Sequence, residues 1–257
     1  MATFCEVKNR SGPANERSSY IEAAGKASCS LYAQDGRHSA PCIHILGSSI
    51  YLTIFDHGGS LSTTGFNIHT KPDVLLRILV GVSAGTLNTL GFDTSIEWYT
   101  IFQDGNQEDI KQVTIERNGQ PSFTIELTRV LFISDNLHGR GTTVWEGMVL
   151  KPGTPGKPAE MTEKARRSGR VVVKDSWIDP LRKYTEGMIL TILHENLIEG
   201  VPKLIHKQQV KAAHPSSRAN KTVMVNNSTH TIRSMVDQYL YHLRVLSRVV
   251  TKPASWC

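Results

Sequence analysis

The sequence predicts an α+β fold in which a small strand-and-helix segment precedes an antiparallel sheet with one helix. Short apolar, β-branched runs alternate with turn residues along most of the chain, which is typical of strands. Two stretches, 72–87 and 181–196, instead have apolar residues at helical spacing. The charge also changes near the middle. Residues 1–128 carry 9 Lys/Arg and 13 Asp/Glu, whereas residues 129–257 carry 20 and 10, which favours two units with different partners.

The length of 257 residues and a composition of 39% apolar and 20% charged residues indicate a globular chain of one or two domains. This balance excludes collagen, coiled coils and wholesale disorder. No apolar run approaches the ~20 residues of a membrane helix, and the polar start lacks the apolar core of a secretory signal. The four cysteines are too scattered for a disulfide framework. We expect an intracellular protein, cytoplasmic or nuclear, with no membrane partner.

The first half is expected to contain a flexible arm and a small α+β segment. Residues 1–40 are polar and show no sustained periodicity, which predicts the arm. The segment 41–128 contains one helix that begins at Pro72, a residue suited to a first helical turn. Its strands, the last of which continues into the second half, are predicted at 42–46, 50–55, 61–68, 96–102, 113–117 and 123–133.

The second half, residues 129–257, is expected to form a five-stranded antiparallel sheet with one helix. The order is strand, glycine turn, strand, loop, strand, helix, strand, loop and strand. Asp179-Pro180 predicts the helix start, with aspartate as the cap and proline at the first helical position. The last run, 241–250, is ambiguous between strand and helix, and its β-branched end favours a strand.

A set of residues in this half has the pattern of a phosphate-binding site. Gly139 and Gly141 lie at a strand-to-strand turn, where a backbone without side chains can close over phosphate groups. Val172 and Lys174 are two apart on one strand and therefore point the same way. Lys174 would then reach the phosphates as a point charge.

Two further positions complete the set. Val144, on the return strand after the glycines, could form with Val172 an apolar roof over a base. Glu186 shares the inward helix face with Ile189 and Leu193, from which it could pair with Lys174 and hold it extended. Each element alone is common, and their order along the chain is what makes the combination informative. This order is that of a protein-kinase small lobe.

The sequence resembles the fungal-type protein kinase family. The second half carries this resemblance in LHGRGTTVW, in VVVKDSW followed by DPLRKYTEGMIL, and in EGVPKL; the first half carries it in GSSIYLTIFDHGGSLSTTGFNIH and LGFDTSIEW. The resemblance covers about residues 40–250 and implies a kinase-like small lobe that binds ATP and Mg²⁺ for phosphoryl transfer to a Ser/Thr hydroxyl. Carried over by position, it implies cofactor-binding roles for Gly139, Arg140, Gly141, Thr142, Val144, Val172 and Lys174, and a catalytic pair of Lys174 and Glu186.

The catalytic strings of a kinase do not occur in this sequence. Phosphoryl transfer needs an aspartate base in a His-Arg-Asp-like loop, an asparagine, and the metal-binding aspartate of Asp-Phe-Gly. After Glu186 the sequence contains a single aspartate, Asp237, which cannot fill two roles. We therefore expect a truncated kinase chain that lacks the larger lobe and is inactive by itself. A deliberate non-catalytic short form is the other possibility, and we favour truncation.

Two non-catalytic functions stay open. The uncovered apolar face of the small lobe could dock on a protein partner, as in a pseudokinase-like interaction module. The basic second half, with Arg166, Arg167 and Arg170 in one predicted loop, could bind nucleic acid. A solvated loop explains those arginines more simply, so nucleotide and protein are the expected partners and nucleic acid is not.

Overall fold

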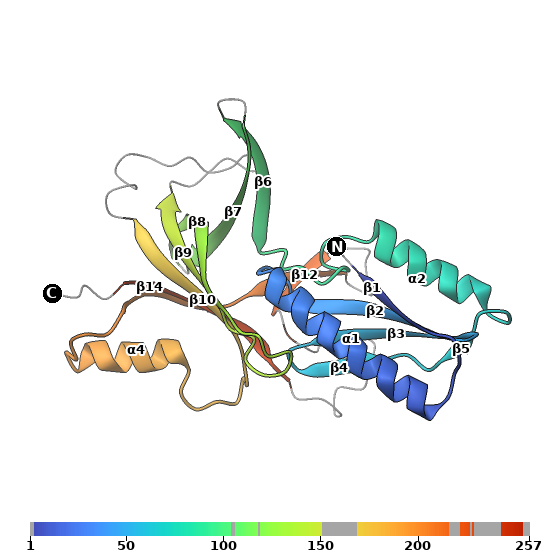
Figure 1. The fold of residues 1–257 in the computed structure, drawn as a ribbon. Coiled ribbons are helices and arrows are strands. Elements are labelled where there is room, and N and C mark those ends of the chain that lie inside the picture. Colours follow the sequence, from blue (N-terminus) through green and yellow to red (C-terminus); the bar gives the residue numbers. More distant parts are fainter. Residues whose placement is uncertain are drawn as a thin grey trace. The chain divides into compact units, whose positions relative to one another are not determined.

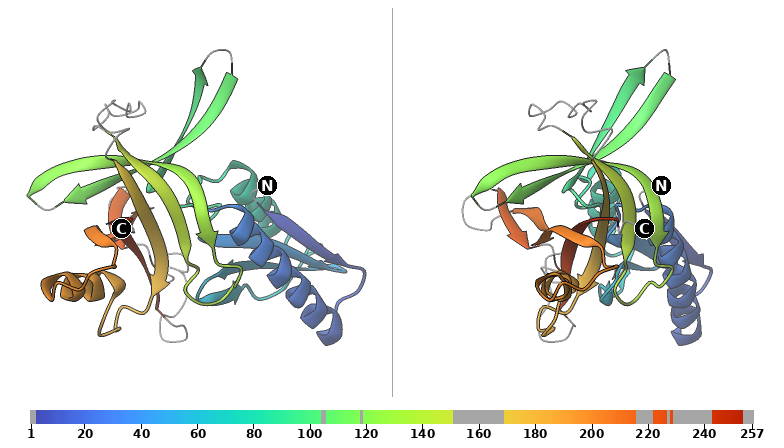
Figure 2. Two further views of the ribbon diagram at one scale, coloured as in Figure 1. Left: turned by 60° about the vertical axis from the view of Figure 1, so that its left-hand side comes forward. Right: turned by 90° about the vertical axis from the view of Figure 1, so that its left-hand side faces the viewer.

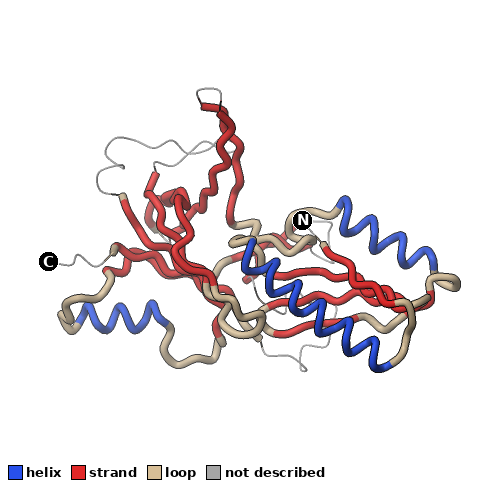
Figure 3. The backbone as a smooth tube through the Cα atoms, in the orientation of Figure 1, coloured by secondary structure: helices blue, strands red, loops and turns tan. Residues whose placement is uncertain are grey.

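The computed structural model describes residues 3–103, 106–117, 119–150, 169–215, 222–226, 228 and 243–253. The predicted α+β class is confirmed: the described residues form three helices, a mixed five-stranded sheet and an antiparallel seven-stranded sheet (Figures 1 and 3). The chain divides into two compact units. The first unit comprises residues 1–94, 134–141 and 213–244; the second comprises residues 95–133, 142–212 and 245–257.

The first unit is built on the five-stranded sheet. Its strands are β1 (Phe4–Lys8), β2 (Ser39–Leu46), β3 (Ser49–Asp56), β4 (Gly59–Ser62) and β5 (Phe66–Asn67). They run in the order β1-β2-β3-β4, and β5 pairs with β3. The pair β1–β2 is parallel and the other pairs are antiparallel. Helix α1 (Pro13–Ala33) forms the connection that a parallel pair requires.

Helix α1 contradicts the prediction of a flexible arm over residues 1–40. The helix presents Ser19, Ala23, Ala27 and Leu31 to the interior, at intervals of four residues along one face. Three of these side chains are small, so the inward face of the helix does not appear in the sequence as regularly spaced large apolar residues. Their size is what lets the helix backbone approach the sheet closely.

Helix α2 (Pro72–Ala84) confirms the predicted helix, with proline in its first turn. None of its side chains is buried, and Leu76 and Val80 are among its exposed residues. No helix in the described part of the chain is long and apolar enough to cross a membrane.

The second unit holds the seven-stranded sheet, in the order β11-β14-β10-β9-β8-β7-β6. Its strands are β6 (Ile96–Gln103), β7 (Asn106–Arg117), β8 (Gln120–Ile133), β9 (Thr143–Leu150), β10 (Arg170–Ile178), β11 (Lys203–Gln209) and β14 (Val245–Lys252). Figure 2 shows that this sheet is strongly twisted. It also shows that β6 and β7 extend past the neighbouring strands of the sheet. A further short pair is formed by β12 (Lys211–Pro215) and β13 (Thr222–Asn226).

This sheet is larger than the five strands predicted for residues 129–257. Strands β6 and β7, which the sequence analysis assigned to the segment 41–128, join the sheet through β8. They do so because their apolar residues belong to its core: Ile96, Val113 and Ile115 pack with Trp145 and Val173. The second unit therefore begins at residue 95. The ambiguous run 241–250 is confirmed as a strand over its C-terminal part, β14.

Helix α4 (Glu186–Glu195) starts later than the sequence suggested. Asp179 does not cap it; the carboxylate accepts the backbone N–H of Leu181 at 2.8 Å and closes a local turn instead. The cap is Thr185, whose hydroxyl accepts the N–H of Met188 at 3.4 Å. Glu186 is therefore the first residue of the helix, where its negative charge is favoured by the helix dipole.

Candidate functional site

Lys174 and Glu186 form an ion pair in the second unit. Lys174 Nζ lies 2.7 Å from Glu186 Oε2, with 32% and 44% of the two side chains exposed. Strand β10 positions the lysine and the first turn of α4 positions the glutamate. Gly187 allows α4 to approach β11 closely, because an added Cβ there would lie 2.5 Å from Cδ of Lys207. The structure thus brings together the two residues predicted as the catalytic pair.

Two predicted apolar residues share the sheet face of Lys174. Val144 of β9 is the direct cross-strand partner of Lys174, and Val172 lies two residues before it on β10. All three are half-buried, whereas Val171 and Val173 point to the buried core on the opposite face. Thr142, also half-buried, precedes β9. On this face the positively charged ammonium group of Lys174 lies beside the apolar side chains of Val144 and Val172. This combination suits an anionic ligand that also has an apolar part.

A buried ion pair that the sequence analysis missed lies next to this lysine. Arg248 of β14 donates to both carboxylate oxygens of Asp175, at 2.8 and 2.6 Å, and to Ser95 Oγ at 3.2 Å. Arg248 is 1% exposed and Asp175 is 4% exposed. The bidentate pair ties β10 to β14 at the residue after Lys174. No local signal could have revealed it, since the two residues are far apart in the sequence.

The three predicted phosphate-loop residues Gly139, Arg140 and Gly141 belong to the first unit. Gly139 donates its backbone N–H to the carbonyl of His57 at 3.0 Å, and Gly141 lies against the ring of the same histidine. Arg140 between them is exposed. The structure therefore brings these residues together with the turn between β3 and β4. Their role toward phosphate stays a prediction.

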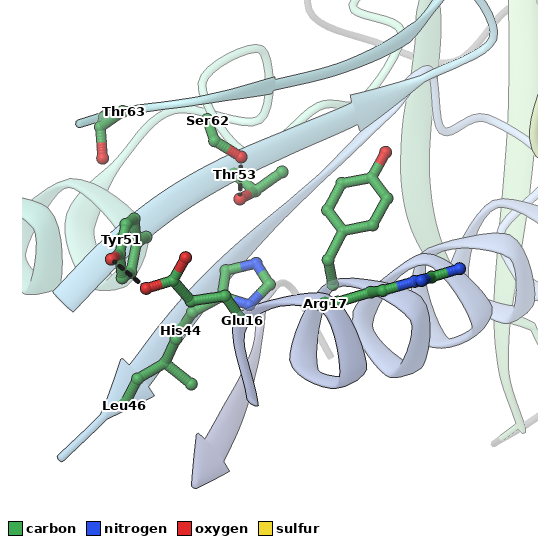
Figure 4. A pocket seen from close by; sticks show the side chains of 9 residues that line it. Glu16, Arg17, His44, Leu46, Tyr51, Thr53, Ser62 and Thr63 are labelled. Atoms are coloured by element: carbon green, nitrogen blue, oxygen red, sulfur yellow. Dashed lines mark hydrogen bonds between the residues drawn. The ribbon is translucent and has the colours of Figure 1, made fainter. Parts of the chain in front are cut away.

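A separate hollow of about 340 Å³ lies within the first unit, between α1 and strands β2 to β4 (Figure 4). Tyr51 donates to Glu16 at 3.2 Å, and Thr53 and Ser62 share a hydrogen bond of 2.6 Å. Because these polar groups bond one another, part of their hydrogen-bonding capacity is already used. None of the predicted nucleotide-site residues lines the hollow. The residues that line it are Glu16, Arg17, Tyr20, His44, Leu46, Tyr51, Thr53, Ser62 and Thr63.

Two other expectations concern metal and nucleic acid. Within the described ranges, no three His, Cys, Asp or Glu side chains gather closely enough to hold a metal ion.

Arg166 and Arg167 of the basic loop lie outside the described residues. Arg170 opens β10 and makes an ion pair with Glu146, which also pairs with Arg129 at 3.1 Å. At least one of the three arginines is thus part of the sheet surface.

Comparison with known proteins identifies the family. A family model described as fungal protein kinase matches residues 1–255. The chain belongs to the fungal protein kinase family. No curated protein and no solved structure matches it. The match confirms the resemblance found in the sequence and extends it to the first 40 residues, which contain β1 and α1.

Proposed function

We propose that the second unit of this fungal kinase family member binds ATP, with Lys174 contacting the phosphates. The observation that carries the proposal is the ion pair between Lys174 and Glu186, in a chain that belongs to a kinase family. A lysine on a half-exposed sheet face samples many rotamers when it is unpaired. Pairing with the carboxylate favours the rotamers that reach Glu186, and the ammonium group has three N–H donors, so it can also meet phosphate oxygens.

The neighbouring side chains support the same ligand. Val144 and Val172 flank Lys174 on one face and would contact the base. Thr142, which precedes β9 in the same unit, would contact phosphates. For Gly139, Arg140 and Gly141, which belong to the first unit, the phosphate-binding role implied by the family resemblance stays a prediction. Mg²⁺ would arrive on the ATP phosphates, which are its usual ligands alongside one or two carboxylates. The bound metal would neutralise part of the phosphate charge.

We further propose that these 257 residues do not transfer the phosphoryl group by themselves. The sequence contains no His-Arg-Asp or Asp-Phe-Gly string, so the base and metal ligands that position the reacting groups have no counterpart in it. Positioning and charge stabilisation provide most of the rate enhancement in phosphoryl transfer. Binding without turnover is the expected behaviour.

The test is a titration of a fluorescent ATP analogue with Mg²⁺ into the wild-type protein and three variants. Lys174→Met should weaken binding at least about tenfold, because a charge-assisted hydrogen bond is lost. Glu186→Gln should weaken it less, since the lysine keeps its charge. Lys203→Met, which removes an exposed lysine at the start of β11, is the matched control and should bind as the wild type does. Equal affinity in all four proteins would refute the proposed site.

A parallel assay addresses turnover. Transfer of radiolabelled phosphate from Mg-ATP to a generic protein substrate should stay at background for the wild type. Turnover that Lys174→Met abolishes would contradict the proposal of a non-catalytic chain while supporting the ATP site.

Docking on a protein partner is a second candidate function. Apolar side chains are exposed along α4 and the segments flanking it: Leu181, Tyr184, Met188, Ile189, Ile192, Leu197 and Ile198. Such a patch is typical of an interaction surface. If a second copy covers it, sedimentation of the wild type between 1 and 100 μM should show association that Ile192→Glu removes. A monomer throughout that range would argue against self-association.

A further inference from the structure

The hollow between α1 and strands β2 to β4 lies entirely within the first unit and shares no residue with the proposed nucleotide site. Its volume of about 340 Å³ is in the range of small-molecule sites. The floor is buried, with Leu46 and Thr53 exposed by only 2% and 1%, whereas rim residues such as Glu16, Tyr20 and Ser62 are exposed. A ligand can therefore enter from solvent and contact side chains of the interior.

The floor also contains a buried imidazole nitrogen that has no hydrogen-bond partner among the described residues. His44 is 4% exposed, and its Nδ1 lies 2.8 Å from Ser19 Oγ, but Nε2 has no partner. Burial lowers the pKa of His44, against the opposing effect of Glu6, so the ring is neutral near pH 7. A buried nitrogen left unpaired costs free energy, so a ligand that supplies the missing hydrogen bond removes this cost.

A carboxylate faces the same space. Figure 4 shows the side chain of Glu16 turned from α1 towards β3, where Tyr51 donates to its Oε1 at 3.2 Å. Within the described part of the chain, no ion pair neutralises this carboxylate. The side chain of Arg17, the next residue of α1, extends away from Glu16 in the same view. The charged group that faces the hollow is therefore negative.

Apolar surface surrounds these polar groups. Leu46 belongs to the floor, and the rings of Tyr20 and Tyr51 line the hollow. Gly65 allows the chain after β4 to lie against the Tyr51 ring, because an added Cβ there would be 2.6 Å from two of its ring carbons. The faces of aromatic rings carry negative potential and attract cations. The aromatic lining thus favours the same sign of charge in a ligand as Glu16 does.

We propose that the hollow binds a small primary amine with an apolar, ring-sized body. Its ammonium group donates to the Glu16 carboxylate and to Nε2 of His44, and its body contacts Leu46 and the two tyrosine rings. An ammonium group has three donors and no acceptor, which suits two groups that both accept. An accepting Nε2 selects the tautomer in which Nδ1 donates to Ser19. Because Nε2 is shielded from solvent, the exposed rim side chains shift when the amine binds.

Three probes with the same phenylethyl body separate the possible charges of the ligand. They are phenethylamine, phenethyl alcohol and hydrocinnamate, and each is titrated at pH 7 into the isotope-labelled full chain, followed by NMR. Phenethylamine should bind, and the alcohol should bind at least about fivefold more weakly, because the charge-assisted hydrogen bonds are lost. Hydrocinnamate should not bind, since its carboxylate would face that of Glu16. The nitrogen resonance of His44 Nε2 should shift with the amine.

Three variants assign the binding to this hollow. Glu16→Gln changes an exposed residue of α1 and should weaken phenethylamine binding at least about tenfold. Glu22→Gln is the matched control, because this carboxylate of the same helix pairs with Lys8 and does not line the hollow. His44→Phe removes the accepting nitrogen and should also weaken binding. If His44→Phe does not fold, Glu16→Gln and the His44 resonance still decide the outcome.

Several results would overturn the proposal. Equal affinity for the amine and the alcohol removes the role of the charge, and unchanged amine binding in Glu16→Gln removes the site. Preference for hydrocinnamate, lost in Arg17→Gln, would instead show a site for anions. Absence of binding by all three probes at millimolar concentration refutes the site altogether. Lys174→Met should bind the amine as the wild type does, so this test and that of the nucleotide site fail separately.

Discussion

Arg248 brings a guanidinium into the interior of the seven-stranded sheet, where it meets the carboxylate of Asp175. Arg248→Met should lower the free energy of unfolding of the protein by about 3–5 kcal/mol, because it leaves the Asp175 charge buried without this partner. Urea unfolding measures the loss. The double variant Arg248→Met/Asp175→Leu should recover much of it, since no charge then stays buried. A loss below about 1 kcal/mol in the single variant would show that the pair contributes little.

His57 makes the stability of the first unit depend on pH. Its folded-state pKa of about 4 lies below the ordinary value of 6.5, mainly because the ring is buried, with His38, Arg244 and His138 lowering it further. Between those two values the unfolded chain binds more protons. The free energy of unfolding should therefore fall as the pH drops from about 6.5 to about 4, by up to about 3 kcal/mol from this residue.

The measurement is urea unfolding of the wild type and of His57→Asn across that pH range. Other groups titrate in both proteins, so the difference between the two curves isolates the histidine. The gap should change with pH in this window and stay constant above pH 7. Parallel curves from pH 7 to pH 4 would contradict the assignment.

At the scale of elements, the start of α4 decides where Glu186 lies. Thr185→Ala removes the helix cap and should cost about 1 kcal/mol of stability. Because Glu186 is the next residue, fraying of this turn should also weaken Mg-ATP binding. Thr185→Ser keeps the hydroxyl and should preserve both properties. If Thr185→Ala lowers the stability but leaves the nucleotide affinity unchanged, the helix cap does not contribute to nucleotide binding.

The elements differ in how well the sequence predicts them, for physical reasons. Helix α2 was predictable, because it depends on local spacing. The pair of Lys174 and Glu186 was predicted from the order of the elements, but the inward helix face proposed for Glu186 with Ile189 was wrong: the buried residues of α4 are Gly187 and Leu190, and Ile189 is 40% exposed. Helix α1 was missed because three of the four residues on its inward face are alanine or serine and only Leu31 is large and apolar. The position of β6 and β7 was also missed, since sheet membership depends on which core Ile96 and Val113 join.

The same reasons apply to the candidate site. Alternation along one strand indicated that Val172 and Lys174 share a face, and register then placed Val144 opposite the lysine. The contact between His57 and Gly141 joins residues far apart in the chain and has no periodic signal. Sequence patterns thus predicted the glycines but not the partner that requires them.

For the whole molecule, the change in charge near residue 128 suggested two units, and the structure has two. Their division does not follow that boundary: β6, β7 and β8 belong to the second unit, and residues 134–141 belong to the first. The family match spans both units. The first unit is therefore part of the kinase-family chain, and its turn between β3 and β4 contacts Gly139 and Gly141 through His57.

The contact between Lys174 and ATP phosphates is the central claim, and an acyl phosphate of ATP tests it most directly. The amine of a lysine beside the phosphates attacks the acyl carbon and releases ATP, leaving an amide that mass spectrometry locates. Lys174 should be labelled, and excess Mg-ATP should suppress its labelling while Lys203 is unaffected. Labelling of Lys174 that is equal with and without Mg-ATP would contradict the account.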